Sequence, residues 1–144
     1  MRAARTFLSW ILAVLVIGVL LFSADAKLFS DPTQPNVAFS ILSERTGVGI
    51  MEPTGRYVVG LIELFAALLV LLPWTRRSGA LLALGIAAGA VAAHLSPYLG
   101  QELPLILGAE ETDGGELFYL SLALSAACGL LMFVHPGRKK RRRV

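Results

Sequence analysis

The chain has few of the residue types from which redox, metal and haem sites are built. Its 144 residues include one cysteine and two histidines. With Cys128 alone, no internal disulfide and no Cys-x-x-Cys pair can form, and we expect its thiol to serve as a small packing group. His94 and His135 follow different apolar runs, which would hold them about a membrane thickness apart. This excludes a bis-histidine haem, and we expect no metal site.

Charged residues are also scarce, and long apolar runs take their place. The chain is 56% hydrophobic and 16% charged, and its mean hydropathy is +0.69. Soluble domains average less than half apolar, so this excess predicts a membrane protein. Each apolar run is close to the ~20 residues that a helix needs to span a bilayer. The runs cover about 7–26, 57–74, 79–95 and 117–134. We therefore predict an all-α integral membrane four-helix bundle, with residues 1–144 forming a single domain.

Acidic residues are absent from one set of connections. The N-terminus, the turn after the second run and the tail 138–144 together hold ten basic residues and no acidic one. Residues 25–56 and 96–116 hold nine acidic residues and three basic ones. Positive charge stays on the cytoplasmic side of a membrane, so both termini are predicted to be cytoplasmic.

Two features at the ends of the chain have alternative interpretations. Arg2 and Arg5 precede an apolar run that ends in Ala24-Asp25-Ala26, so a cleaved signal peptide remains an alternative to a first span. The basic tail 138–144 resembles a nucleic-acid patch in composition alone. Directly after a span, however, such a tail fixes topology and attracts anionic lipid. We therefore expect a lipid bilayer as its partner and no nucleic acid.

The longer connections are expected to lie on the outer side. In the first of them, Asn36 is a good start signal for a short helix and Gly47 a good stop signal. Such a helix would lie along the membrane surface. The connection 96–116 is rich in proline and glycine, which predicts a loop.

Small residues recur every four positions in the third run, at Gly85, Gly89 and Ala93. Faces of this kind let membrane helices approach closely. The partner would be another span, another membrane protein or another copy of the chain. Ser121, Ser125 and Gly129 form a similar stripe in the fourth run.

One carboxylate interrupts the second run. Glu63 lies six residues beyond Tyr57, or about 9 Å below the boundary of the run. A buried ionisable group in a membrane pairs with a partner or becomes neutral. Lys27 and His94 are predicted at the same depth, so the three side chains form a candidate polar pocket. The structural alternatives are a simple ion pair between Lys27 and Glu63 and an ordinary interfacial histidine at His94.

Several segments resemble the DoxX-like family of small bacterial four-span membrane proteins. They are the AKLF after the first run, the VGLIELFAALLVLLP that contains Glu63, the GALLALGIAAGAVAAHL that ends near His94, and GGELF before the last run. The resemblance implies a place in the bacterial cytoplasmic (inner) membrane. It also implies that Lys27 and Glu63 match polar positions of the family, and His94 a histidine of one branch. The family takes its name from a subunit linked to thiosulfate and quinone oxidation. The lack of cysteine pairs argues against the thiol chemistry of some of its relatives.

Two hypotheses for function follow. In the first, the protein is a redox-associated subunit whose outer pocket holds a quinone or a similar lipophilic molecule. No other cofactor is expected, and the residues do not decide whether the protein is an enzyme. In the alternative, it is a scaffold, assembly factor or accessory subunit that contacts a partner through the third run. Transport is a weaker interpretation, because no second carboxylate lies in any run.

Overall fold

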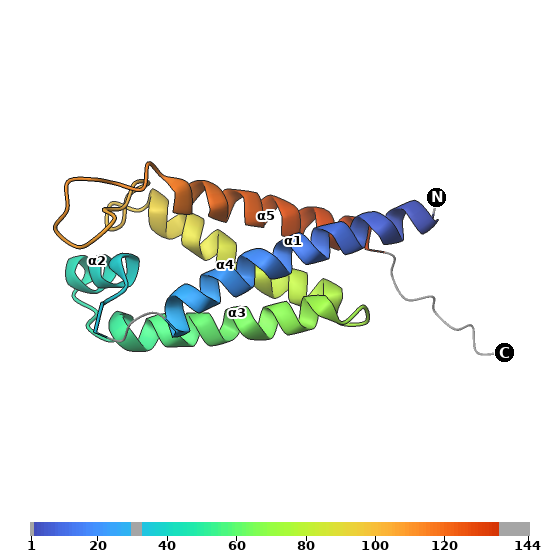
Figure 1. The fold of residues 1–144 in the computed structure, drawn as a ribbon, viewed down its shortest axis with the longest axis horizontal. Coiled ribbons are helices and arrows are strands. Elements are labelled where there is room, and N and C mark those ends of the chain that lie inside the picture. Colours follow the sequence, from blue (N-terminus) through green and yellow to red (C-terminus); the bar gives the residue numbers. More distant parts are fainter. Residues whose placement is uncertain (1, 30–32, 136–144) are drawn as a thin grey trace.

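The computed structural model describes residues 2–29 and 33–135, which are helical over most of their length (Figure 1). Their elements are α1 (Arg2–Leu28), α2 (Val37–Thr46), the π-helical turn η1 (Met51–Gly55), α3 (Arg56–Leu71), α4 (Arg76–Leu95) and α5 (Glu116–Val134). Within these residues no strand forms, and the only β-type pairing is an isolated bridge between Pro104 and Thr112. The predicted all-α fold is confirmed.

Four of the described helical segments are long and apolar enough to cross a membrane. They are Ala3–Leu28, Met51–Leu71, Arg76–Leu95 and Glu116–Val134. Their lengths and compositions do not decide which end faces the cytoplasm, so the cytoplasmic placement of both termini stays a prediction. The basic tail 138–144 lies outside the described residues.

The short helix α2 begins and ends at the predicted signals. The side-chain oxygen of Asn36 accepts a hydrogen bond from the backbone N–H of Phe39, at 3.3 Å, and so caps the first turn. At the other end, Gly47 has a φ of 73°, the left-handed conformation that stops a helix at low cost. The predicted helix is confirmed. Its Ile41 packs with Leu99 and Leu103 of the long connection after α4.

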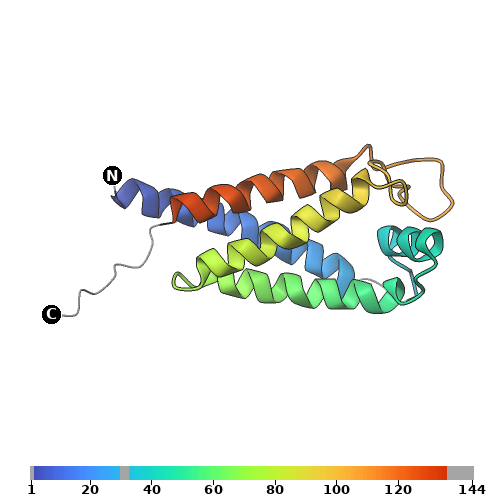
Figure 2. The ribbon, with the colours of Figure 1, turned by 180° about the vertical axis from the view of Figure 1, so that it is seen from behind.

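The four long helices cross rather than run parallel along their whole length. We call the end with α2 and the connection 96–115 the loop end, and the end with the turn 72–75 between α3 and α4 the hairpin end. In Figure 1, α1 crosses from α5 at the hairpin end to α3 at the loop end. Seen from behind in Figure 2, α4 crosses from α3 at the hairpin end to α5 at the loop end. The helices are therefore paired differently at the two ends of the bundle.

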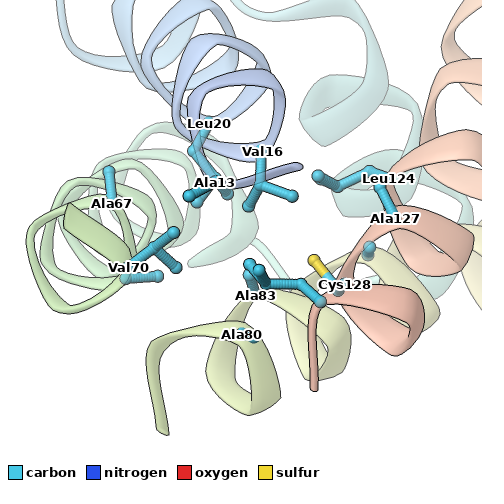
Figure 3. Close-up of a cluster of buried hydrophobic side chains, with 13 residues drawn as sticks. Ala13, Val16, Leu20, Ala67, Val70, Ala80, Ala83, Leu124, Ala127 and Cys128 are labelled. Carbon is cyan, nitrogen blue, oxygen red and sulfur yellow. The ribbon is translucent and has the colours of Figure 1, made fainter. Parts of the chain in front are cut away.

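The main core consists largely of alanine and other small or medium side chains (Figure 3). Small side chains allow neighbouring helix backbones to approach closely, as α3 and α4 do at Gly79. Cys128 belongs to this core and is fully buried, in line with its expected packing role. The buried members of the core are Ala13, Val16, Leu20, Ala66, Ala67, Val70, Ala80, Ala83, Ala87, Leu124, Ala127, Cys128 and Leu131.

Two glycines lie at close contacts between helices. A Cβ placed on Gly79 would lie 2.5 Å from the backbone nitrogen of Val70 in α3. A Cβ placed on Gly60 would lie 2.8 Å from Cγ of Leu28 in α1. At Gly79 the nearest atoms belong to the backbone, so there is no room for a side chain, whereas at Gly60 the Leu28 side chain would have to shift to admit one.

The small residues Gly85, Gly89 and Ala93, which were predicted to pack closely against another helix, have a different environment. A Cβ on Gly85 or Gly89 would meet no other atom within 4 Å, and both residues are exposed. Ala93 packs against the cluster of Ile41, Leu99 and Leu103. The crossing of α4 directs Ala80, Ala83 and Ala87 toward the core instead. Close approach of another span at Gly85 and Gly89 is therefore absent, and contact with another protein or another copy stays a prediction.

Candidate functional site

A cavity of about 460 Å³ lies in the loop-end half of the bundle. Side chains from α1, α2, α3, α4 and α5 line it, and most of them are apolar. The candidate residues Lys27, Glu63 and His94 all line this one cavity. Its volume falls within the range of about 300–1,000 Å³ that is usual for small-molecule pockets.

Lys27 and Glu63 form an ion pair between α1 and α3. Lys27 Nζ lies 3.0 Å from Glu63 Oε1, and the two side chains are 15% and 5% exposed. Ser23, one turn before Lys27, donates its hydroxyl hydrogen to the same Oε1 at 2.8 Å. Lys27 Nζ also donates to Ser23 Oγ and to the backbone oxygen of Ser23. Because an ammonium group has three N–H donors, these contacts with Glu63 and Ser23 use its full capacity.

The second oxygen of Glu63 has no such partners. Oε2 is buried and makes no hydrogen bond to any described residue. A buried carboxylate oxygen without a donor carries the cost of its lost hydration. Glu63 lines the cavity, so its Oε2 is an acceptor that a ligand in the cavity could use.

His94 lies in the last turn of α4 and also lines the cavity. Its Nδ1 lies 2.8 Å from the backbone oxygen of Gly100. A carbonyl oxygen only accepts, so Nδ1 carries the hydrogen, and Nε2 of the neutral ring is an acceptor. The ring also packs edge-on against Phe118 of α5, with centroids 5.9 Å apart. The interactions of His94 thus hold the loop and α5, whereas Lys27 is the side chain that pairs with Glu63.

Sequence reasoning missed Ser23. Ser23 lies four residues before Lys27 and therefore on the same helix face, so this spacing could have indicated that the two side chains interact. Nothing in the local pattern, however, distinguishes Ser23 from a serine that bonds to its own helix backbone.

Sequence reasoning also missed a buried polar cluster at the hairpin end. Arg76 was counted only as a topology charge, yet it is almost fully buried. Its guanidinium carbon lies 3.9 Å from the ring centroid of Trp10, and its Nε donates to the backbone oxygen of Val70 at 2.9 Å. Its Nη1 donates to Ser9 Oγ at 3.3 Å, and Ser9 Oγ lies 2.9 Å from Nδ1 of His135. Arg76 therefore joins α1, α3, α4 and the end of α5.

Within residues 2–29 and 33–135, no group of three or more histidine, cysteine, aspartate or glutamate side chains is placed to hold a metal ion.

Comparison with known proteins corrects the family assignment. The family model described as methylamine utilisation protein MauE matches residues 5–102, which include most of α1 and all of α2, α3 and α4. No curated protein and no solved structure matches the chain. The DoxX-like assignment is therefore wrong. A lysine after one span and a glutamate within the next satisfy a general need to pair buried charges in a bilayer, so this pattern does not identify one family.

Proposed function

The chain belongs to the MauE family, and on that premise we propose that it is an accessory membrane protein that acts through a membrane-embedded partner. It is a multi-pass protein of the bacterial cytoplasmic (inner) membrane. The family match is the observation that carries the proposal. The description of the family names methylamine utilisation, and we propose that this chain serves a system of that kind.

The contacts made by the buried polar residues support an accessory role. Lys27 and Glu63 join α1 to α3, and Arg76 joins the helices at the hairpin end. His94 holds the connection after α4. These groups connect the helices, and Lys27, Arg76 and His94 each donate hydrogen bonds within the protein.

The exposed small-residue face of α4 supports a partner contact. Gly85 and Gly89 present bare backbone to the surroundings of the bundle. In a membrane, association depends on close van der Waals packing, because lipid is as apolar as the helices. We propose that a helix of the partner packs along this face.

A redox subunit that binds a quinone receives less support. Quinone carbonyls only accept hydrogen bonds, so they need free donors. Lys27 has spent its three donors and His94 Nδ1 donates to Gly100. Glu63 Oε2, a buried atom with no hydrogen-bond partner among the described residues, is itself an acceptor.

Growth of a deletion strain tests the proposed system. In the bacterium that carries the gene, deletion should abolish or strongly slow growth on methylamine and leave growth on ammonium unchanged. A plasmid copy should restore growth. Equal growth of the deletion strain and its parent on methylamine would contradict the proposal.

Crosslinking tests the proposed contact. In a Cys128→Ala background, Gly89→Cys places a thiol on the exposed face of α4, and Leu68→Cys places one on an exposed position of α3 as a control. In native membranes, a short bifunctional thiol–amine reagent should join the Gly89→Cys chain to one defined protein, and the control should give none. Products of equal identity and yield from both positions would show that α4 has no specific partner.

A further inference from the structure

We infer that the loop-end cavity binds a lipophilic molecule with a neutral hydroxyl head, and that this hydroxyl donates a hydrogen bond to Glu63 Oε2. This inference concerns a ligand site and does not depend on the proposed accessory role.

The requirement for a donor comes from Glu63. Its side chain is 5% exposed. Oε1 accepts hydrogen bonds from Lys27 and Ser23, whereas Oε2 is buried with no hydrogen-bond partner among the described residues. Hydrogen bonds to a charged acceptor are stronger than neutral ones, and an unmade bond at a buried acceptor is costly. A ligand that donates to Oε2 removes this cost, so the site favours donors.

Three other polar side chains of the cavity reinforce this preference. Lys27 uses all of its donors on Ser23 and Glu63, and Ser121 donates its hydroxyl hydrogen to the backbone oxygen of Leu117 at 2.8 Å. His94 Nδ1 donates to the backbone oxygen of Gly100, so this nitrogen has no donor left for a ligand. A ligand with only a carbonyl or ether oxygen would bring one more acceptor to these residues.

The head should be uncharged because the ion pair is already balanced. A cationic head would add a second positive charge beside Lys27, and an anionic head would face Glu63 across the same cavity. Either charge would be buried without a counter-ion, which is expensive within a bilayer. A neutral hydroxyl makes the hydrogen bond without this cost.

The body of the ligand should be apolar and should enter from the lipid. The lining is mostly apolar, and it reaches the outside of the bundle at Phe22, which is 67% exposed. Phe22 lies in the spanning part of α1, where acyl chains surround the protein. A hydroxyl-bearing lipid and a free long-chain alcohol share the required chemistry.

A matched pair of photoreactive probes tests the inference. The protein is placed in nanodiscs of phosphatidylcholine, whose head has no hydroxyl group. One probe is a long-chain alcohol with a diazirine in the chain, and the other is its methyl ether, which can accept but not donate. The alcohol should label the lining segments of α4 and α5 about tenfold more than the ether, since one charge-assisted hydrogen bond is lost. Equal labelling by the two probes would overturn the inference.

Substitution of Glu63 gives a second prediction about the same pair of probes. In Glu63→Gln, Lys27 can only donate, so it keeps its hydrogen bond to the side-chain oxygen of the glutamine. The amide NH₂ group then takes the position of Oε2 and offers donors in place of an acceptor. The labelling ratio of alcohol to ether should fall to about 1. Glu44→Gln on the exposed side of α2 is the control and should keep the ratio of the unchanged protein. An unchanged ratio in a folded Glu63→Gln variant would also overturn the inference.

Substitutions in α4 do not alter the ion pair, so they test binding in the cavity even if Glu63→Gln fails to fold. Ala90 lines the cavity, whereas Ala88 is exposed on the same helix and does not. Ala90→Leu should abolish most labelling by the alcohol, and Ala88→Leu should leave it unchanged. Equal labelling of the two variants would contradict binding in the cavity.

Competition identifies the source of the ligand. Displacement of the probe by diacylglycerol in the disc, whose head is a neutral hydroxyl, supports the inference and assigns a lipid head. Displacement by unlabelled long-chain alcohol alone supports it and assigns a free lipophile. Displacement by an oxidised quinone as effectively as by the alcohol would overturn it, because a quinone has no hydroxyl.

Discussion

Gly79 of α4 lies against the backbone of Val70 in α3, where an added Cβ would stand 2.5 Å from the Val70 nitrogen. The contact is backbone to backbone, so no side-chain rotation can relieve it. It fixes the separation of α3 and α4 at the hairpin end.

The first prediction compares Gly79→Ala with Gly89→Ala in the same helix. Gly79→Ala should destabilise the protein by about 1–3 kcal/mol, the usual cost of overpacking. Gly89→Ala should be neutral or slightly stabilising, because its Cβ meets open space and alanine favours helix. Thermal unfolding in detergent measures both variants. Similar melting temperatures for the two would show that the contact at Gly79 is not rigid.

The second prediction concerns the ion pair. Lys27→Met leaves Glu63 buried without its counter-ion, and removal of one partner from a buried pair typically costs about 3–5 kcal/mol. The double variant Lys27→Met with Glu63→Leu should recover most of this loss, because no charge remains to be buried. Denaturant unfolding in detergent gives the double-mutant cycle. A double variant less stable than Lys27→Met would mean that packing, not charge, dominates the site.

The third prediction concerns pH and His135, which follows the last span. Burial lowers the pKa of His135 below its ordinary value of 6.5, and the nearby Arg76 and Arg77 lower it further, against the opposing hydrogen bond to Pro73. Since the folded pKa lies below the unfolded one, the unfolded chain binds a proton first as the pH falls. Stability is therefore full above about 6.5 and declines as the pH drops through the folded pKa.

His135→Gln isolates this effect. The variant should be less stable than the unchanged protein at pH 7.5, and the difference should shrink toward pH 5. Melting temperatures across this range test it. A constant difference would mean that His135 does not change its charge on unfolding.

The fourth prediction concerns topology. The basic residues of the N-terminus, the 72–77 region and the tail predict that the hairpin end is cytoplasmic. A reporter that is active only in the cytoplasm should work when fused after Val144 and fail when inserted near Gly108 in the connection 96–115. Activity near Gly108 and none after Val144 would show that the protein has the opposite orientation in the membrane.

Local signals in the sequence predicted much of the secondary structure. The cap at Asn36 and the left-handed Gly47 specified α2, and apolar length specified the helices that span a membrane. Counting residues from the boundary of the run placed Glu63 at the level of Lys27, because helical rise is constant.

The relations between helices could not be predicted in the same way. Spacing shows which residues share a face, but it does not show which helix that face meets. The crossing of α1 and α4 decides that Gly79, not Gly89, touches a neighbouring backbone. It also creates a cavity beside Glu63 that no pattern of residues indicates.

Cys128 has a practical consequence for studies of the intact protein. It is the only thiol in the chain, and it is fully buried among the core side chains. A thiol reagent can reach it only in molecules whose helices have separated. Under conditions where reclosing outpaces the reagent, the labelling rate of the unaltered protein therefore reports the equilibrium population of such open molecules.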